Sequence, residues 1–150
     1  MTFRIRALVL LGILCVFGTS CRKRIPAPTM ILPEHQVFYS EESRLPEARG
    51  TVIRDAETWR RWWETITGAS TAPPVVDFSS NMLLLYNAGR RQAGDRVEIF
   101  RMQPSNGELV VWYRIIEAGT PGTESYPVQV VQVRRQAGQH RFERQPIFDP

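Results

Sequence analysis

Two adjacent arginines, Arg90 and Arg91, are the residues whose type and spacing most suggest a binding site. They lie in a polar segment, residues 88–95, close to Gly89 and Gly94. Guanidinium groups form charge-assisted, often bidentate hydrogen bonds to carboxylates and phosphates. The segment is therefore either a small-ligand site or a solvated polar turn between two strands, and the turn is our expectation.

Two carboxylates, Asp77 and Asp95, lie beside expected strand ends. A carboxylate in such a place can bind a metal ion or act as a base. An unrecognised hydrolase would therefore combine Arg90 and Arg91 with Asp77 or Asp95. Asp side chains also accept hydrogen bonds from backbone amides in turns. We expect this turn role for both carboxylates.

The chain contains no recognisable catalytic motif. Its two histidines, His35 and His140, are far apart in the sequence, and neither lies near a motif. The patterns HExxH, GxSxG and CxxC and a phosphate-binding glycine loop are all absent. Nothing singles out one serine as part of a Ser/His/Asp triad. The sequence predicts a protein that is not an enzyme and that has neither a cofactor nor a metal.

The net charge of +4 does not indicate nucleic-acid binding. Five of the 19 basic residues lie at positions 4, 6 and 22–24, which leaves 14 basic residues against 15 acidic ones. The rest of the chain is therefore close to neutral and lacks the basic surface that nucleic acid requires. The early basic residues are better explained by export and by anionic lipid headgroups.

The first 20 residues have the pattern of a secretory signal peptide. Two arginines precede an apolar stretch at residues 7–17, which is too short to span a bilayer comfortably, and Gly18-Thr19-Ser20 follow. Cys21 comes next, and this arrangement resembles the lipobox of bacterial lipoproteins. The resemblance implies a diacylglycerol-modified Cys21 and attachment to a membrane. It departs from the usual pattern at Gly18, where that family usually has Leu, so an ordinary signal peptide or anchor is the alternative.

The remaining chain predicts one folded domain on a short tether. Residues 21–34 contain three prolines and no hydrophobic period, which is typical of an extended linker. Residues 35–145 form the expected domain, and residues 146–150 form an irregular tail. Cys15 would be removed with the signal peptide, so no disulfide is expected within the mature chain. Arg22, rather than Asp, after Cys21 favours the outer membrane over the inner one if the organism sorts lipoproteins as enteric bacteria do.

One amphipathic helix is expected between Asp55 and Gly68. Asp55 is a good N-cap and Gly68 a good terminator. Large apolar side chains recur at i, i+3, i+4 and i+7, at Trp59, Trp62, Trp63 and Ile66. Such a stripe favours burial in a core, and a sugar-stacking platform and a membrane-interface belt are the alternatives.

The other periodic segments predict strands, and the class is α+β. We expect one helix on a mostly antiparallel sheet of about five to six strands. The expected strands are residues 50–54, 82–86, 96–102, 109–116 and 128–133. Residues 35–40 are either a first strand or an ordered arm, and residues 140–144 are the candidate for a last strand. Residues 88–95, 104–107 and 119–124 are expected turns or loops. Exposed strand edges and glycine-containing loops are a common means of binding an extended peptide.

The order of these segments from residue 52 to residue 134 resembles the PrcB-like family, named for a subunit of a bacterial surface protease complex. The matching pieces are the tryptophan-containing helix, a Pro-rich loop, an apolar strand, a Gly-basic-x-x-Gly turn at residues 89–94, and Tyr126-Pro127 before a late strand. The resemblance implies a non-catalytic domain that associates with or stabilises a protease. It suggests residues 89–95 and Tyr126-Pro127 as contact regions. The turn departs from the family pattern at residues 92–96.

Three hypotheses follow. The first is a lipid-anchored envelope protein that binds or stabilises a partner, with a surface protease as the candidate. The second is a small-ligand binder or hydrolase that uses Arg90 and Arg91 with Asp77 or Asp95. The third is an envelope spacer that only packs against its neighbours.

Overall fold

Helix α1 (Ala56–Thr67) begins and ends at the residues that the sequence predicts. The computed structural model describes residues 30–145, so Cys21, the predicted signal peptide and the C-terminal tail lie outside the described residues. Asp55 caps the helix by accepting a hydrogen bond from the Thr58 amide at 2.7 Å. Gly68, at φ 64°, ends it by donating its amide to the Glu64 carbonyl. In the described part, no helix is long and apolar enough to cross a membrane.

The tryptophan stripe is core, as predicted. Trp59 and Ile66 are each 1% exposed, and Trp62 and Trp63 are half-buried against the same cluster. The ring of Trp63 packs edge-on against both Trp59 and Phe38. Trp59 also donates its indole N–H to the Pro74 carbonyl at 3.0 Å, which satisfies its polar atom inside the core.

A four-stranded antiparallel sheet lies above the helix, in the order β1–β8–β3–β2. Its strands are β1 (His35–Ser40), β2 (Ala48–Ile53), β3 (Asn81–Ala88) and β8 (Val128–Arg134). Successive residues of β3 point to opposite faces. Leu83 and Leu85 pack with the helix, whereas Met82, Leu84 and Tyr86 belong to a second core on the other face. The central strand is therefore covered on both sides, as its continuous apolar run predicts.

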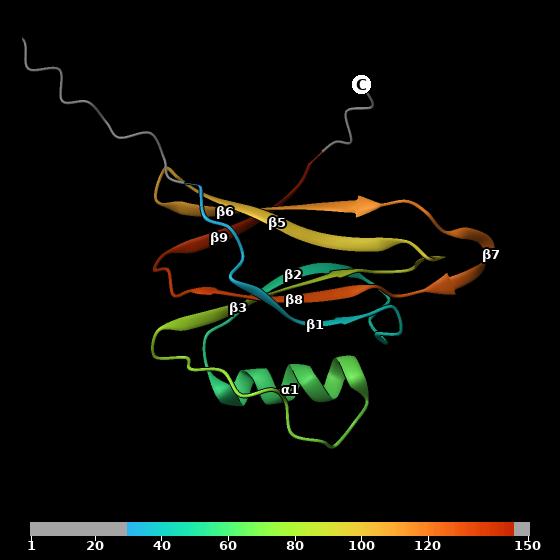
Figure 1. Ribbon diagram of the computed structural model, residues 1–150, viewed down its shortest axis with the longest axis horizontal. Helices are drawn as coiled ribbons and strands as arrows, with labels where there is room; N and C mark the ends of the chain where they lie inside the picture. The colour runs from blue at the N-terminus through green and yellow to red at the C-terminus, as the bar shows by residue number, and fades with distance from the viewer. Residues whose placement is uncertain (1–29, 146–150) are drawn as a thin grey trace, which may run out of the picture.

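A second sheet covers the other face and gives the molecule three layers (Figure 1). It contains β5 (Arg96–Ser105), β6 (Glu108–Ile116) and β9 (Gln139–Arg144). Asn106 and Gly107 connect β5 to β6 with φ angles of 49° and 82°. Positive φ at both positions is the requirement of a type I′ hairpin, which Asn-Gly fulfils. Strand β9 runs parallel to β6, and this pair is the exception to the antiparallel pattern among the described strands.

Two strands occur where the sequence predicts none. Residues 88–95 contain β4 (Arg91–Ala93), and the expected loop at residues 119–124 is largely β7 (Thr120–Ser125). These strands pair antiparallel with each other. Both segments are polar, so no apolar alternation marks them as strands. The predicted α+β class is confirmed, but the described residues contain nine strands rather than five or six.

The N-terminal end of the described chain joins the two sheets. Ile31 exchanges two backbone hydrogen bonds of 2.9 Å with Met102 on β5, and the Glu34 amide donates to Gln132 on β8. Ile31 also packs against the core between the sheets. The fold thus includes the last residues of the segment that the sequence predicts as tether.

Arg54, directly after β2, links the two sheets on the opposite side from Ile31. It donates to the Gly138 carbonyl at 3.0 Å and to Nδ1 of His140 at 2.9 Å. His140 therefore accepts at Nδ1, so its ring is neutral with the proton on Nε2. Burial, together with the nearby charge of Arg54, holds the pKa of His140 below its ordinary value of 6.5.

We expect the Trp59→Ala variant to lose about 3–5 kcal/mol of unfolding free energy, because it leaves a large cavity between helix and sheet. Urea denaturation followed by circular dichroism measures this loss. The Glu64→Ala variant, on the exposed face of the same helix, is the control and should change stability by less than about 0.5 kcal/mol. Equal effects of the two substitutions would contradict the packing described above.

The stability of the fold should decrease as the pH falls through 6.5. The unfolded state binds a proton on His140 at its ordinary pKa, whereas the folded state resists protonation, so the unfolded state binds more protons below that pH. This stabilisation is fully present above pH 6.5 and is lost toward the lower pKa of the folded state. Urea denaturation at pH 7.5 and 5.5 measures the change. The His140→Gln variant, whose amide oxygen can still accept from Arg54, should show a smaller difference; an unchanged difference would exclude His140 as its source.

Candidate functional site

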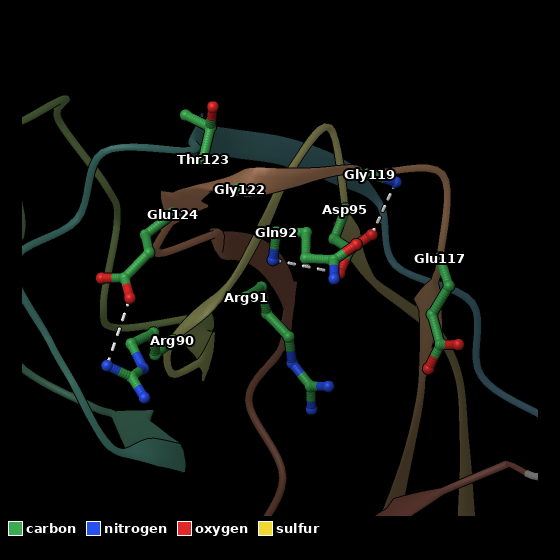
Figure 2. A pocket seen from close by; sticks show the side chains of 9 residues that line it. All are labelled: Arg90, Arg91, Gln92, Asp95, Glu117, Gly119, Gly122, Thr123 and Glu124. Carbon is green, nitrogen blue, oxygen red and sulfur yellow. Dashed lines mark hydrogen bonds and ion pairs between the residues drawn. The ribbon is translucent and has the colours of Figure 1, made fainter.

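An open polar cleft of about 590 Å³ lies at the end of the molecule where β4 and β7 pair (Figures 1 and 2). We call it the β4–β7 cleft. Its lining comes from β4 and the residues beside it, and from the segment between β6 and the end of β7. The lining residues are Arg90, Arg91, Gln92, Asp95, Glu117, Gly119, Gly122, Thr123 and Glu124. Three of the residues singled out from the sequence, Arg90, Arg91 and Asp95, thus lie in one cleft.

Asp95 holds the two walls of the cleft together. Its carboxylate accepts hydrogen bonds from the backbone amides of Gln92 at 3.3 Å, Ala118 at 3.1 Å and Gly119 at 2.8 Å. A side chain at Gly119 would lie 2.6 Å from the Gln92 Cβ and 2.7 Å from the Asp95 carboxylate, so glycine is required for this approach. Asp95 is only 6% exposed. It has the turn role that the sequence predicts, and it is not positioned as a base.

Two ion pairs lie at the sides of the cleft. Arg90 pairs with Glu124 at 3.2 Å, and Arg144 on β9 pairs with Glu117 at 3.1 Å. All four side chains are largely exposed, so each pair contributes at most about 1 kcal/mol to stability. Their importance here is that each of the two glutamates already has its own arginine.

Arg91 is the cation of the cleft that has no acidic partner within the described residues. Its Nε donates to the Ala88 carbonyl at 3.3 Å, so the Nε end of the guanidinium group is held by the backbone. Figure 2 shows the rest of the group extending between the Arg90–Glu124 pair and Glu117. The side chain is half-buried, so its charge is less screened than that of Arg90.

Tyr86 on β3 and Tyr113 on β6 stack against each other. The rings of Tyr86 and Tyr113 are 3.7 Å apart between centroids, and Tyr86 is buried. Burial, and then the hydrogen bond with Tyr113, raises the pKa of Tyr86 far above its usual value. The charges of Arg91 and Arg144 act in the opposite direction.

A second open cleft, of about 460 Å³, adjoins the first and shares Glu124 with it. Tyr126 lines it together with residues of the segment that follows β1. The two regions suggested by the PrcB-like resemblance are thus neighbours: the Ala88 amide donates to the Pro127 carbonyl at 2.9 Å. Gly89 and Pro127 are themselves buried, so they shape this end of the fold and offer no side-chain contact. Gly94, at φ 99°, allows the turn between β4 and Asp95.

Ser43 and Asn87 fix the segment that lines the second cleft. The Ser43 hydroxyl lies within hydrogen-bond distance of both the Asn87 side-chain oxygen (3.1 Å) and the Tyr126 carbonyl (2.6 Å). The Asn87 amide donates to the carbonyls of Leu45 and Glu47. Both side chains are 1% exposed. The sequence does not mark these two residues, because a polar residue at a strand end gives no signal of its distant partners.

Asp77 lies at the other end of β3 from the β4–β7 cleft. Its carboxylate accepts hydrogen bonds from the Ser79 amide at 2.9 Å and from the hydroxyls of Ser79 and Ser80 at 2.6 Å. These bonds, that of the Ser79 hydroxyl foremost, lower the pKa of Asp77 to about 2. The alternative in which Asp77 acts together with Arg90 and Arg91 is wrong, because Asp77 lies at the opposite end of β3 from the cleft. The predicted turn role of Asp77 is confirmed.

Glu117 and Glu124 are the charged lining residues that the sequence does not mark as part of a site. Glu124 is the last residue of the predicted loop at residues 119–124, and Glu117 lies two residues before that loop. The sequence offers one indication that these glutamates lie near the arginines, which is opposite charge. Two acids lie in or beside the glycine-containing segment at residues 119–124, and two arginines lie in the segment at residues 88–95. Charge complementarity alone does not show that two loops meet.

The lining of the β4–β7 cleft consists of charged and polar residues and glycines. Its lining contains no histidine or cysteine, and its one hydroxyl belongs to Thr123. Within residues 30–145, no three metal-ligating side chains gather at one point. His140 accepts a hydrogen bond from Arg54 elsewhere in the fold.

Comparisons of the chain with protein-family models, curated proteins and solved structures give no match. The PrcB-like resemblance therefore stays a prediction from the sequence.

We expect the Asp95→Ala variant to lose about 1–3 kcal/mol of unfolding free energy, since three backbone amides lose their acceptor. Amide hydrogen exchange at Ala118 and Gly119 should accelerate in the same variant. Asp95→Asn, which keeps one acceptor oxygen, should have an intermediate effect. Wild-type exchange rates in Asp95→Ala would contradict the role described here.

Proposed function

We propose that this protein is a non-catalytic envelope protein, attached to the membrane through a lipid on Cys21, that binds or stabilises a partner protein. A surface protease is the candidate class of partner, as the PrcB-like resemblance implies. We propose further that the partner binds at the β4–β7 cleft. The observation that carries the proposal is the unpaired, backbone-held guanidinium of Arg91 in an open polar cleft.

The chemistry of the cleft supports binding over catalysis. A hydrolase needs a nucleophile and a base within hydrogen-bond reach of each other. The best-placed acid, Asp95, has its carboxylate occupied by backbone amides. Glu117 and Glu124 are paired with arginines. A binding role uses the same groups without an activated nucleophile.

The openness of the cleft supports a protein segment as the ligand. Small-molecule sites are usually enclosed and mostly apolar, whereas this cleft is polar and β7 forms one exposed wall, with residues 120–124 accessible. An extended segment of another protein can lie along such a wall and use backbone contacts. A small anionic ligand of Arg91 is the alternative, and the experiment below separates the two.

Affinity capture from detergent-solubilised membranes tests the proposal. The mature chain should retain one partner stoichiometrically, and the Thr123→Trp variant should lose it, because an indole at this exposed cleft position obstructs a protein segment. Gln139→Trp, at an exposed position on β9 outside the cleft, is the matched control and should retain the partner. Absence of a stoichiometric partner, or equal capture by both variants, would count against this site. A small-ligand binder would show no partner but would retain a low-molecular-weight compound.

The predicted anchor has its own test. The intact mass of the membrane-extracted protein should correspond to a chain that begins at Cys21 and carries a lipid-sized increment. The Cys21→Ser variant should appear in the soluble fraction, since it lacks the thiol that is alkylated. Retention of this variant in the membrane fraction would disprove anchoring through Cys21.

A further inference from the structure

We infer that the β4–β7 cleft is a carboxylate-recognition site, in which the guanidinium of Arg91 receives a carboxylate group of the partner. This inference rests on the proposed function and specifies the chemistry of what binds. The first reason is geometric. The Arg91 Nε is engaged by the Ala88 carbonyl, so the two terminal nitrogens remain for a ligand. Two parallel N–H donors match the two oxygens of a carboxylate.

The second reason is the charge around Arg91. Glu124 and Glu117, the two glutamates that line the cleft (Figure 2), are paired with Arg90 and Arg144. The Asp95 carboxylate is held by backbone amides. No acidic side chain in the described part forms an ion pair with Arg91. The guanidinium of Arg91 is thus left without an acidic partner among the described residues, and a carboxylate of the ligand would serve as that partner.

The third reason concerns which anion fits. A phosphate carries up to two charges at neutral pH and is normally bound by several cations or by a row of backbone amides. The cleft offers one unpaired arginine, because the other arginine of its lining, Arg90, is paired with Glu124. A singly charged, planar carboxylate matches both the fork and the local charge.

The carboxylate can be the C-terminus of a partner chain or an Asp or Glu side chain within it. Three short peptides distinguish these sources: acetyl-Ala-Ala-Ala with a free C-terminus, acetyl-Ala-Glu-Ala-amide, and acetyl-Ala-Ala-Ala-amide as the neutral control. Each is titrated into the ¹⁵N-labelled mature full-length chain in detergent micelles. The Nε–Hε resonance of Arg91 and the backbone amides of Gly119 and Thr123 report binding.

We expect saturable shifts with at least one carboxylate-bearing peptide and none with the neutral peptide. Arg91→Gln should weaken binding by about tenfold or more, as expected for the loss of charge-assisted hydrogen bonds. Arg91→Lys should also bind more weakly, because an ammonium group lacks the planar fork. Arg60→Gln, at an exposed helix position, is the control and should bind like the wild type.

Equal shifts from the neutral peptide, wild-type affinity in Arg91→Gln, or no binding of any peptide would overturn the inference. These failures differ from failure of the proposed function. If the mature chain captures a partner that Arg91→Gln also captures, the partner-binding proposal stands and carboxylate recognition is wrong. If carboxylate peptides bind but no protein is captured, the site stands and the partner-protein proposal is wrong.

Discussion

The pairing of β3 with β8 is the interaction on which the rest of this structure depends. The two strands lie at the centre of the four-stranded sheet, and the alternation of their side chains supplies both cores. Met82, Leu83, Leu84 and Leu85 are all 0% exposed. Burial of each such side chain contributes about 1.5–3 kcal/mol. Strands that are apolar on both faces must be covered twice, so the helix on one side and the second sheet on the other are consequences of this pair.

The same pair determines where polar groups gather. The register places Asn87 opposite Val128, so the chain leaves β3 and enters β8 at the same end of the molecule. The segments that continue from this end cannot enter either core because they are polar. They pair with each other instead, as β4 and β7, and Asp95 satisfies the backbone amides at their junction. The cleft is therefore built from groups that the two cores exclude.

The position of Ile31 constrains how the domain would sit on a membrane. Ile31 is held on β5 by two backbone hydrogen bonds. An extended chain spans at most about 3.6 Å per residue, so the ten residues from Cys21 to Ile31 reach about 35 Å at most. A lipid on Cys21 would thus keep the folded domain within about its own diameter of the bilayer.

Features that depend on neighbouring residues along the chain can be predicted without the structure. Asp55 and Gly68 delimit the helix through local hydrogen bonds, and Asn106-Gly107 forms the hairpin through its own φ angles. The apolar run at residues 82–86 requires burial on two faces in any fold. The tertiary structure alone decided the rest: the pairing of β4 with β7, the parallel approach of β9 to β6, and the meeting of Arg91 with Glu117 and Glu124. The physical reason is that polar segments have no periodic signal, and their partners are chosen by where the apolar strands bring their ends.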